Sequence, residues 1–171
     1  MNIEPILSRY LKSVFNYVFR IVGDKSETED IVQEAFVKVW KNLKKFNPEN
    51  NFKTWLFTIA RNTAIDQLRK RKNISFSQID SLTDGEDEKN FQGNVVDIEP
   101  LPDEIFMRKE LNEELENALS KIRLDFREII FLHYMEDLTF EEISGIVDKP
   151  LNTVKSHHLR ALATLRKIIT K

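Results

Sequence analysis

The chain has 171 residues, of which 41% are hydrophobic and 32% charged, a balance that favours a globular protein over a fibrous or disordered one. It contains no cysteine, which excludes disulfides, zinc ribbons and thiol chemistry, and its four glycines argue against a glycine-rich phosphate loop. The first residues lack a basic segment followed by an apolar run, and no stretch approaches the roughly 18 apolar residues of a membrane span. We therefore expect a cytoplasmic protein.

The small net charge of −2 conceals three blocks of different sign. Residues 1–72 carry 14 Lys and Arg against 8 Asp and Glu, residues 73–106 carry 1 against 9, and residues 107–171 carry 11 against 11. The acidic middle also lacks helical periodicity, since Ser, Asp, Gly, Asn and Pro are scattered among isolated apolar residues. This pattern predicts two folded units with different partners, joined by a flexible, solvated linker over residues 73–102.

Apolar residues recur at helical spacing in three stretches of the basic block, and strand signals are nearly absent. Gly23 ends the first stretch. Ser26 precedes Glu29 by three residues, the capping-box spacing, and predicts the start of the second helix. One of two asparagines can then cap a third helix from about Phe52 to Lys72.

Helical spacing returns after Pro102, with a second start predicted at Asp125, where Glu128 follows three residues later. Further on, Thr139 and Glu142 form another capping box at the head of a short apolar helix. Pro150 interrupts that pattern.

A last helix is expected from about Asn152 to Thr170. A short helix, a turn of about four residues and a longer helix predict a helix-turn-helix.

Two adjacent histidines, His157 and His158, stand in this last helix. They point about 100° apart, so they cannot share a metal as an i, i+4 pair does. We expect His158 to be packed or hydrogen-bonded on the apolar face, and His157 to lie at the rim of the polar half. That half could meet phosphates and base edges, although a merely solvated face would carry similar charge. It holds Asn152, Thr153, Ser156, Leu159 and Arg160.

Two extended motifs carry a family resemblance. The stretch LTFEEISGIVDKPLNTVKSHHLRALATL resembles region 4 of bacterial sigma factors, and DIVQEAFVKVWKNL followed by FKTWLFTIARNTAIDQLRKRK resembles their region 2. Their order, the chain length and the lack of a third domain between them resemble the extracytoplasmic-function group of the sigma-70 family. The resemblance implies an all-α protein of two small helical domains, with region 2 over residues 1–72, the acidic linker over 73–102 and region 4 over 103–171.

The resemblance also implies a function. Such a factor binds core RNA polymerase and directs promoter-specific initiation by recognising minus-10 and minus-35 promoter elements. It performs no chemistry of its own and needs no cofactor or metal. Family habit adds an anti-sigma factor, often membrane-bound, as a further partner.

On the second helix, Asp30, Gln33 and Glu34 lie outward of the apolar stripe. A solvated face would explain the carboxylates, but these residues match family positions that contact the clamp coiled coil of the polymerase largest subunit. The resemblance therefore implies a polymerase-binding face here.

On the third helix a polar arc is formed by Thr54, Thr58, Arg61, Asn62 and Arg69. The basic run at its end could merely favour the helix C-terminus, but beside this arc it suits a phosphate-guided approach to bases. By resemblance the helix and the preceding residues 44–51 bind the minus-10 element, with Asn62 as the strongest single candidate and Thr58, Arg61 and Arg69 beside it. Phe52 and Trp55 are expected to pack in the core rather than to stack on bases.

In the last helix, Lys155, Ser156, Leu159 and Arg160 match the DNA-facing positions of the family, with Thr153 near the phosphates. The sequence departs from the family pattern at Asn152 and His157, where Gly and Arg are usual. The two departures bear on the geometry of the turn before this helix and on one contact with the DNA backbone.

Two other classes of protein compete with this interpretation. A stand-alone regulator would bind a symmetric operator without polymerase, usually as a dimer, yet the chain has no sustained heptad and the first block would have no purpose. A nuclease would need clustered metal ligands, which the sequence does not show.

Overall fold

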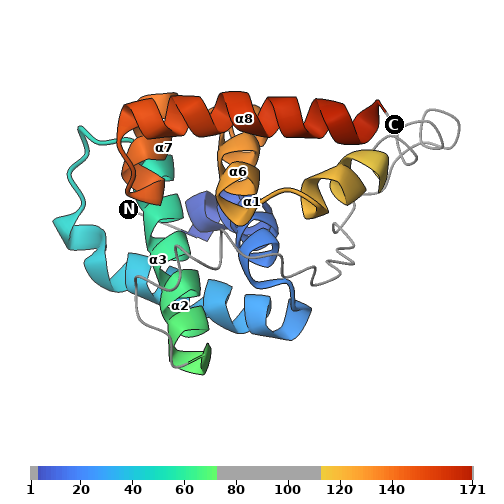
Figure 1. The fold of residues 1–171 in the computed structure, drawn as a ribbon. Coiled ribbons are helices and arrows are strands. Elements are labelled where there is room, and N and C mark those ends of the chain that lie inside the picture. The colour runs from blue at the N-terminus through green and yellow to red at the C-terminus, as the bar shows by residue number, and fades with distance from the viewer. Residues whose placement is uncertain (1–3, 73–112, 171) are drawn as a thin grey trace, which may run out of the picture.

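The computed structural model describes residues 4–72 and 113–170. Every regular element within these residues is a helix, which confirms the expected all-α class (Figure 1). The predicted linker, residues 73–102, and the first ten residues expected for the second domain, 103–112, lie outside the described residues. In chain order the elements are α1 (Glu4–Val22), α2 (Lys25–Asn42), the 3-10 turn η1 (Leu43–Lys45), α3 (Phe52–Lys72), a helix over residues 113–120, α6 (Leu124–Ile130), the π-helical turn η2 (Phe131–Met135), α7 (Phe140–Val147) and α8 (Leu151–Ile169).

The turn between α1 and α2 lies earlier than the capping pattern predicts. Gly23 ends α1 with φ = 80°, a left-handed conformation that costs glycine little, and α2 begins two residues later. Asp24 is the N-cap, and its carboxylate accepts a hydrogen bond of 2.8 Å from the backbone N–H of Glu27. The predicted cap at Ser26 is therefore wrong, because Ser26 already lies inside the first helical turn.

The start of α3 agrees with prediction. The Asn51 side chain accepts a hydrogen bond of 2.9 Å from the backbone N–H of Lys53. Phe52 and Trp55 pack with Phe46 in an aromatic cluster, the ring centroids of Phe46 and Trp55 lying 4.9 Å apart. Both rings also lie against the core, so they pack inward as expected.

The predicted capping pair at Asp125 and Glu128 is wrong. Helix α6 begins at Leu124 with Arg123 at its N-cap, and no side chain caps it. The Asp125 carboxylate instead accepts hydrogen bonds from the Arg123 guanidinium, and Glu128 turns toward α1 and α3. A polar residue at the capping-box spacing can thus serve tertiary packing in place of a cap.

Helices α7 and α8 form the expected helix-turn-helix. Thr139 and Glu142 make both hydrogen bonds of the predicted capping box. Asp148 ends α7 in the left-handed region with φ = 53°, and Pro150 stands at the N-cap of α8. The turn is therefore one residue shorter than expected, spanning residues 148–150.

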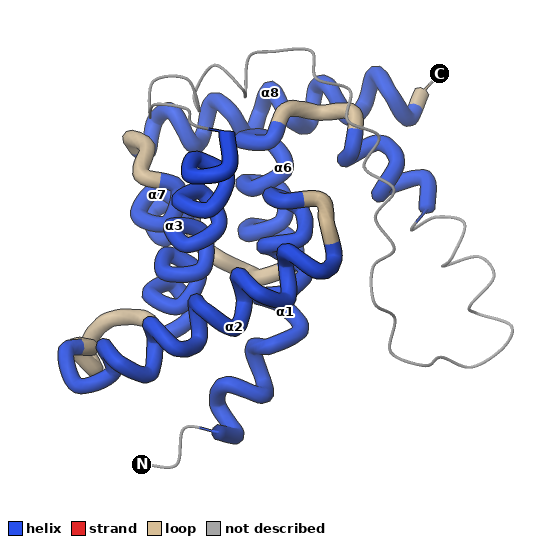
Figure 2. The backbone as a smooth tube through the Cα atoms, turned by 90° about the horizontal axis from the view of Figure 1, so that it is seen from below, coloured by secondary structure: helices blue, strands red, loops and turns tan. Residues whose placement is uncertain are grey.

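The helices stack in four layers: α2, then α1 with α3, then α6 with α7, and finally α8 (Figures 1 and 2). One apolar core passes through the first three layers and reaches α8 at Val154, so it is shared by both halves of the chain. A second, smaller core lies wholly in the C-terminal half, between the helix over residues 113–120, α6 and α8. In this structure the two units therefore pack directly on each other.

Candidate nucleic-acid and polymerase interfaces

The outer side of α8 presents a polar and partly apolar stripe. Its inner side buries Val154, Ala161 and Leu165, and this packing fixes which residues face outward. Lys155, Leu159 and Arg160 are exposed, Leu159 by 67%. The remaining predicted contacts are half-buried: Thr153, and Ser156, whose hydroxyl donates a hydrogen bond of 3.2 Å to the Thr153 carbonyl.

The turn before α8 contains no glycine and is held by two hydrogen bonds between Ser144 and Lys149. The Ser144 hydroxyl donates a hydrogen bond of 2.7 Å to the Lys149 carbonyl, and the Lys149 N–H donates one of 3.2 Å to the Ser144 carbonyl. Asn152, which replaces the family glycine, is exposed in the first turn of α8. The N-terminal half of α8 is thus fixed in orientation, as a helix that enters a DNA groove must be.

The two adjacent histidines contact different neighbours. The Nδ1 atom of His157 lies 3.3 Å from an Asp125 carboxylate oxygen, and its ring packs edge-on against Phe126. Only 14% of its side chain is exposed, so the predicted place at the rim of a DNA-facing surface is wrong. His158 shares a hydrogen bond of 2.9 Å with the Tyr134 hydroxyl, as expected for a hydrogen-bonded histidine.

Burial lowers the pKa of both histidines, although Asp125 opposes the effect at His157. At neutral pH both rings are therefore neutral. They contribute packing and hydrogen bonds to the helix-turn-helix unit rather than positive charge for DNA.

The polar arc of α3 does not form one open surface. Asn62 is exposed, while Thr58 is half-buried and its hydroxyl donates a hydrogen bond of 2.8 Å to the Thr54 carbonyl. The Arg69 guanidinium lies 3.0 Å from the Asp66 carboxylate on the same helix. Arg61 is directed into the boundary between the two units.

At this boundary Arg61 meets Glu128 of α6. The Nε atom of Arg61 donates to one carboxylate oxygen at 2.8 Å and an Nη atom donates to the other at 3.3 Å. The Tyr17 hydroxyl of α1 donates a third hydrogen bond of 2.9 Å to the same carboxylate. The Glu128 side chain is only 3% exposed and that of Arg61 16%, so water is largely excluded from the pair.

These contacts fix the protonation of Arg61 and Tyr17. Burial opposes the charge of Arg61, but the Glu128 carboxylate outweighs it, and the pKa of Arg61 is raised. Burial and then the charge of Glu128 raise the pKa of Tyr17 well above its ordinary value, so the hydroxyl stays protonated and remains a donor. Arg61 therefore stays positively charged and Tyr17 neutral at any physiological pH.

Two further polar contacts link α3 and its cap to the second unit. The Lys53 ammonium lies 2.8 Å from the Glu136 carboxylate, and the Asn51 amide donates a hydrogen bond of 2.7 Å to Glu142. Sequence patterns did not predict either contact, because both join residues more than 80 positions apart. One local feature of the sequence does point to such contacts. Glu128 lies within the most apolar stretch of the second block, and a buried carboxylate there needs a hydrogen-bonding or charged partner.

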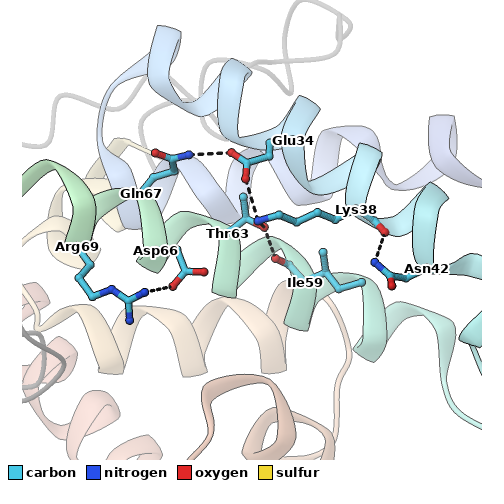
Figure 3. A network of polar contacts seen from close by, with 8 residues as sticks. All are labelled: Glu34, Lys38, Asn42, Ile59, Thr63, Asp66, Gln67 and Arg69. Atoms are coloured by element: carbon cyan, nitrogen blue, oxygen red, sulfur yellow. Dashed lines mark hydrogen bonds and ion pairs between the residues drawn. The ribbon is translucent and has the colours of Figure 1, made fainter.

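The outward side of α2 carries the residues expected to bind polymerase. Asp30 and Gln33 are exposed, whereas Glu34 is half-buried. Its carboxylate accepts a hydrogen bond of 2.7 Å from the Gln67 amide and lies 2.8 Å from the Lys38 ammonium (Figure 3). Hydrogen bonds from Lys38 and Gln67 lower the pKa of Glu34, which keeps it ionised.

A groove of about 510 Å³ runs between α2 and α3 beside these residues. Its walls are made by Glu27, Asp30, Ile31, Glu34, Gln67, Leu68, Lys70 and Arg71. Farther along α2, Val37 and Trp40 are exposed, Trp40 by 61%. The exposure of the large Trp40 side chain makes it a further interface candidate, although its place in an apolar helical stretch would favour packing.

The chain resembles known proteins in both of its helical units. The family description Sigma-70 region 2 matches residues 6–74, and Sigma-70, region 4 matches residues 112–165. The chain is 31% identical over 162 residues to the ECF RNA polymerase sigma factor SigW of Bacillus subtilis, covering 95% of this chain and 86% of that protein. It is also 31% identical over 158 residues to the ECF RNA polymerase sigma-E factor of Escherichia coli K12, covering 91% and 80%.

Solved structures share the fold. The sigma factor RpoE of Bartonella quintana, solved in complex with the anti-sigma factor NepR, superposes with a TM-score of 0.69 at 24% identity, covering 98% of this chain and 96% of that one. CnrH, solved with the cytosolic domain of CnrY, gives a TM-score of 0.63 at 19% identity, covering 97% and 86%. None of the described helices is long and apolar enough to cross a bilayer.

Proposed function

Because the chain belongs to the extracytoplasmic-function sigma factors of the sigma-70 family, which direct promoter-specific initiation by core RNA polymerase, we propose how its helices share this work. The division follows the expected domains, with region 2 over residues 1–72, the linker over 73–102 and region 4 over 103–171. Family membership removes the support for a stand-alone regulator or a nuclease. The place of action is the cytoplasm, where core polymerase works.

Helix α8 reads the minus-35 element as duplex DNA. The observation that carries this assignment is the outward stripe of Lys155, Leu159 and Arg160 on the second helix of a helix-turn-helix. Charged side chains there can contact phosphates or guanine edges, and an exposed leucine can contact a thymine methyl group. Thr153 and Ser156 lie half-buried beside them and complete the contact set.

Helix α3 binds the minus-10 element. Exposed Asn62 can hydrogen-bond a base edge, and the basic end of the helix beyond Arg69 can approach phosphates. Thr58 and Arg61 belong to the same arc in the sequence, and they take part once Arg61 is released from Glu128.

Helix α2 binds core polymerase through Asp30, Gln33 and Glu34. The exposed pair Val37 and Trp40 extends this face with apolar area, and aromatic side chains are enriched in the cores of protein interfaces. An anti-sigma factor, as named in the RpoE complex, is a further partner that this family membership suggests.

Site-specific photo-crosslinking in the complete polymerase complex tests these assignments. A photoreactive residue is placed in turn at Lys155, Asn62 and Gln33, and at exposed Lys12 of α1 as a control. The complex is assembled on promoter fragments selected by transcription from a genomic library. Lys155 should cross-link to minus-35 DNA, Asn62 to minus-10 DNA and Gln33 to the largest polymerase subunit. DNA cross-links that are no stronger at Lys155 and Asn62 than at Lys12 would contradict the assignment of α8 and α3.

A further inference from the structure

Arg123 lies outside the helix-turn-helix, immediately before α6, and its side chain is held in one orientation. Its Nε and Nη atoms donate hydrogen bonds of 3.2 and 3.1 Å to the two carboxylate oxygens of Asp125. The guanidinium carbon also lies 5.2 Å from the centre of the Phe126 ring. The Arg123 side chain is nevertheless 42% exposed, so two contacts orient a guanidinium that still reaches solvent.

Both residues that orient Arg123 also contact α8. An Asp125 carboxylate oxygen lies 3.3 Å from Nδ1 of His157, and the Phe126 ring packs edge-on against the His157 ring with centroids 5.4 Å apart. Arg160 follows His157 by three positions, so these two side chains are neighbours on the surface of α8. Arg123 therefore lies beside the outward stripe of α8, on the flank that carries His157.

This flank carries positive charge although His157 itself is neutral. Burial is the main cause of the lowered pKa of His157, and the charges of Lys149, Arg123 and Arg160 lower it further, against the opposing effect of Asp125. Three cations thus lie within electrostatic range of one neutral ring. His157 stands where arginine is usual in the family, so the positive charge on this flank comes from the residues around that position.

The flanks of a recognition helix are where phosphates are met. The major groove is about 12 Å wide and a helix with its side chains is about 10 to 12 Å across, so a sugar-phosphate backbone runs along each side of the helix. A guanidinium offers several N–H donors in a planar fork that matches phosphate, and Asp125 accepts from two of them. Ion pairs at half-exposed positions are weak, so Asp125 orients Arg123 without preventing a phosphate from binding it.

We propose that Arg123, held by Asp125, is a further minus-35 contact that binds a DNA phosphate on the flank of α8 that carries His157. The proposal rests on the minus-35 role of α8 given above. A phosphate contact carries no sequence information, but it fixes the register of the helix in the groove. Arg123 thus adds affinity and orientation, whereas the outward stripe of α8 reads the sequence.

Neutral methylphosphonates, placed one at a time along both backbones of the minus-35 element, test this contact. The complete polymerase complex is bound to these promoter fragments at several salt concentrations. Arg123→Gln removes the guanidinium, and Arg166→Gln is the matched control, because it removes the same charge from an exposed arginine farther along α8. Arg123→Lys keeps the charge but lacks the fork.

The wild-type complex should bind about tenfold less tightly when one particular phosphate beside the minus-35 element is neutral. Arg123→Gln should show the same loss on the unmodified fragment and no further loss from that methylphosphonate. Its plot of log K against log salt should be less steep by about 1, equally on the original and on altered minus-35 sequences. Arg123→Lys should keep the wild-type slope, and Arg166→Gln should keep the wild-type response to the methylphosphonate.

A second variant covers a loss of folding. If circular dichroism shows that Arg123→Gln loses helical content, Arg123→Ser replaces it, because serine is favoured at the N-cap position that Arg123 occupies. The same changes in affinity, salt dependence and methylphosphonate response are expected of it.

The contrary results are distinct from one another. If Arg123→Gln responds to the methylphosphonates and to salt as Arg166→Gln does, Arg123 contacts no phosphate and the proposal is overturned. A change in the preferred minus-35 sequence also overturns it, since a phosphate contact cannot read sequence. If no methylphosphonate around the minus-35 element weakens binding by the wild-type complex, the minus-35 role of α8 itself fails.

Discussion

Arg61 of α3 and Glu128 of α6 form a two-point ion pair across the boundary between the two units, although 67 residues separate them in the sequence. Both side chains are largely removed from water, and Tyr17 satisfies a further hydrogen bond of the carboxylate. Burial of an unpaired charge is energetically unfavourable, and each partner offsets that cost for the other. The pair therefore joins the packing of the two units to a residue expected to contact DNA.

A double-mutant cycle can measure this coupling. Arg61→Gln and Glu128→Gln should each lower the free energy of unfolding by about 3 kcal/mol, because each leaves a buried charge alone. The double variant should lose less than the sum of the two, since it leaves no unpaired charge. Urea unfolding followed by circular dichroism gives all four values.

The half-exposed pair of Arg69 and Asp66 is the control for this cycle, and its coupling should stay below about 1 kcal/mol. Strict additivity at Arg61 and Glu128 would show that the contact has no energetic weight.

The N-cap of α7 should matter for the helix-turn-helix. Thr139→Ala removes both its hydroxyl contacts with the backbone N–H and carboxylate of Glu142, and should lower the free energy of unfolding by about 1 kcal/mol. Thr164→Ala removes a hydroxyl in the middle of α8 and should change it by less than about 0.5 kcal/mol. Equal losses for the two variants would argue against a special role of the cap.

Stability should fall in mild acid because of His158. Burial and the nearby His133 lower the pKa of His158 in the folded protein, whereas in the unfolded chain it returns to 6.5. The unfolded chain then binds more protons below that pH, so the free energy of unfolding decreases as the pH falls through 6.5 and is fully retained above it.

Replacement by glutamine, His158→Gln, keeps a hydrogen-bonding group for Tyr134 but removes the titration. The loss of stability between about pH 7.5 and about pH 5.5 should be smaller in this variant than in the wild type. Denaturant melts at several pH values give the comparison, and identical slopes for the two proteins would remove His158 as a source.

The local pattern of the sequence was enough to predict most helices and the helix-turn-helix. Capping at Thr139 and Asn51 could be predicted because a cap joins residues two or three positions apart. The error at Ser26 has the same origin, since Asp24 and Ser26 both offer a capping side chain and only the turn at Gly23 decides between them.

The candidate sites were less predictable because they depend on tertiary contacts. Periodicity placed Arg61 and Asn62 on one arc, yet region 4 covers the first and leaves the second exposed. His157 was misplaced for a related reason. A helical angle gives the direction of a side chain, and only the neighbouring helices determine whether that direction leads to water.

Arg160 should contribute directly to promoter recognition. If it contacts a base, Arg160→Ala should weaken promoter binding by the complete polymerase complex by about 1 to 3 kcal/mol. Arg166→Ala, which removes an exposed arginine farther along α8, is the control and should have a smaller effect. Filter binding and footprinting provide the readouts. Wild-type affinity together with an unchanged footprint for Arg160→Ala would remove it from the site.

Asp30 should contribute to polymerase binding without affecting the fold, because its side chain is exposed. Asp30→Asn should weaken the association with purified core polymerase by about 1 kcal/mol or more. Glu29→Gln makes the same change of charge at the adjacent exposed position and should have a smaller effect. Titration with fluorescently labelled protein would show this difference, and equal affinities for the two variants would place the polymerase contact elsewhere.

The most direct test of the central claim is run-off transcription with purified core polymerase and a library of genomic fragments, with and without this protein. Addition of the protein should produce discrete transcripts that begin at defined promoters and are absent with core polymerase alone. If no promoter-specific transcript depends on the protein, its assignment as an initiation factor is contradicted.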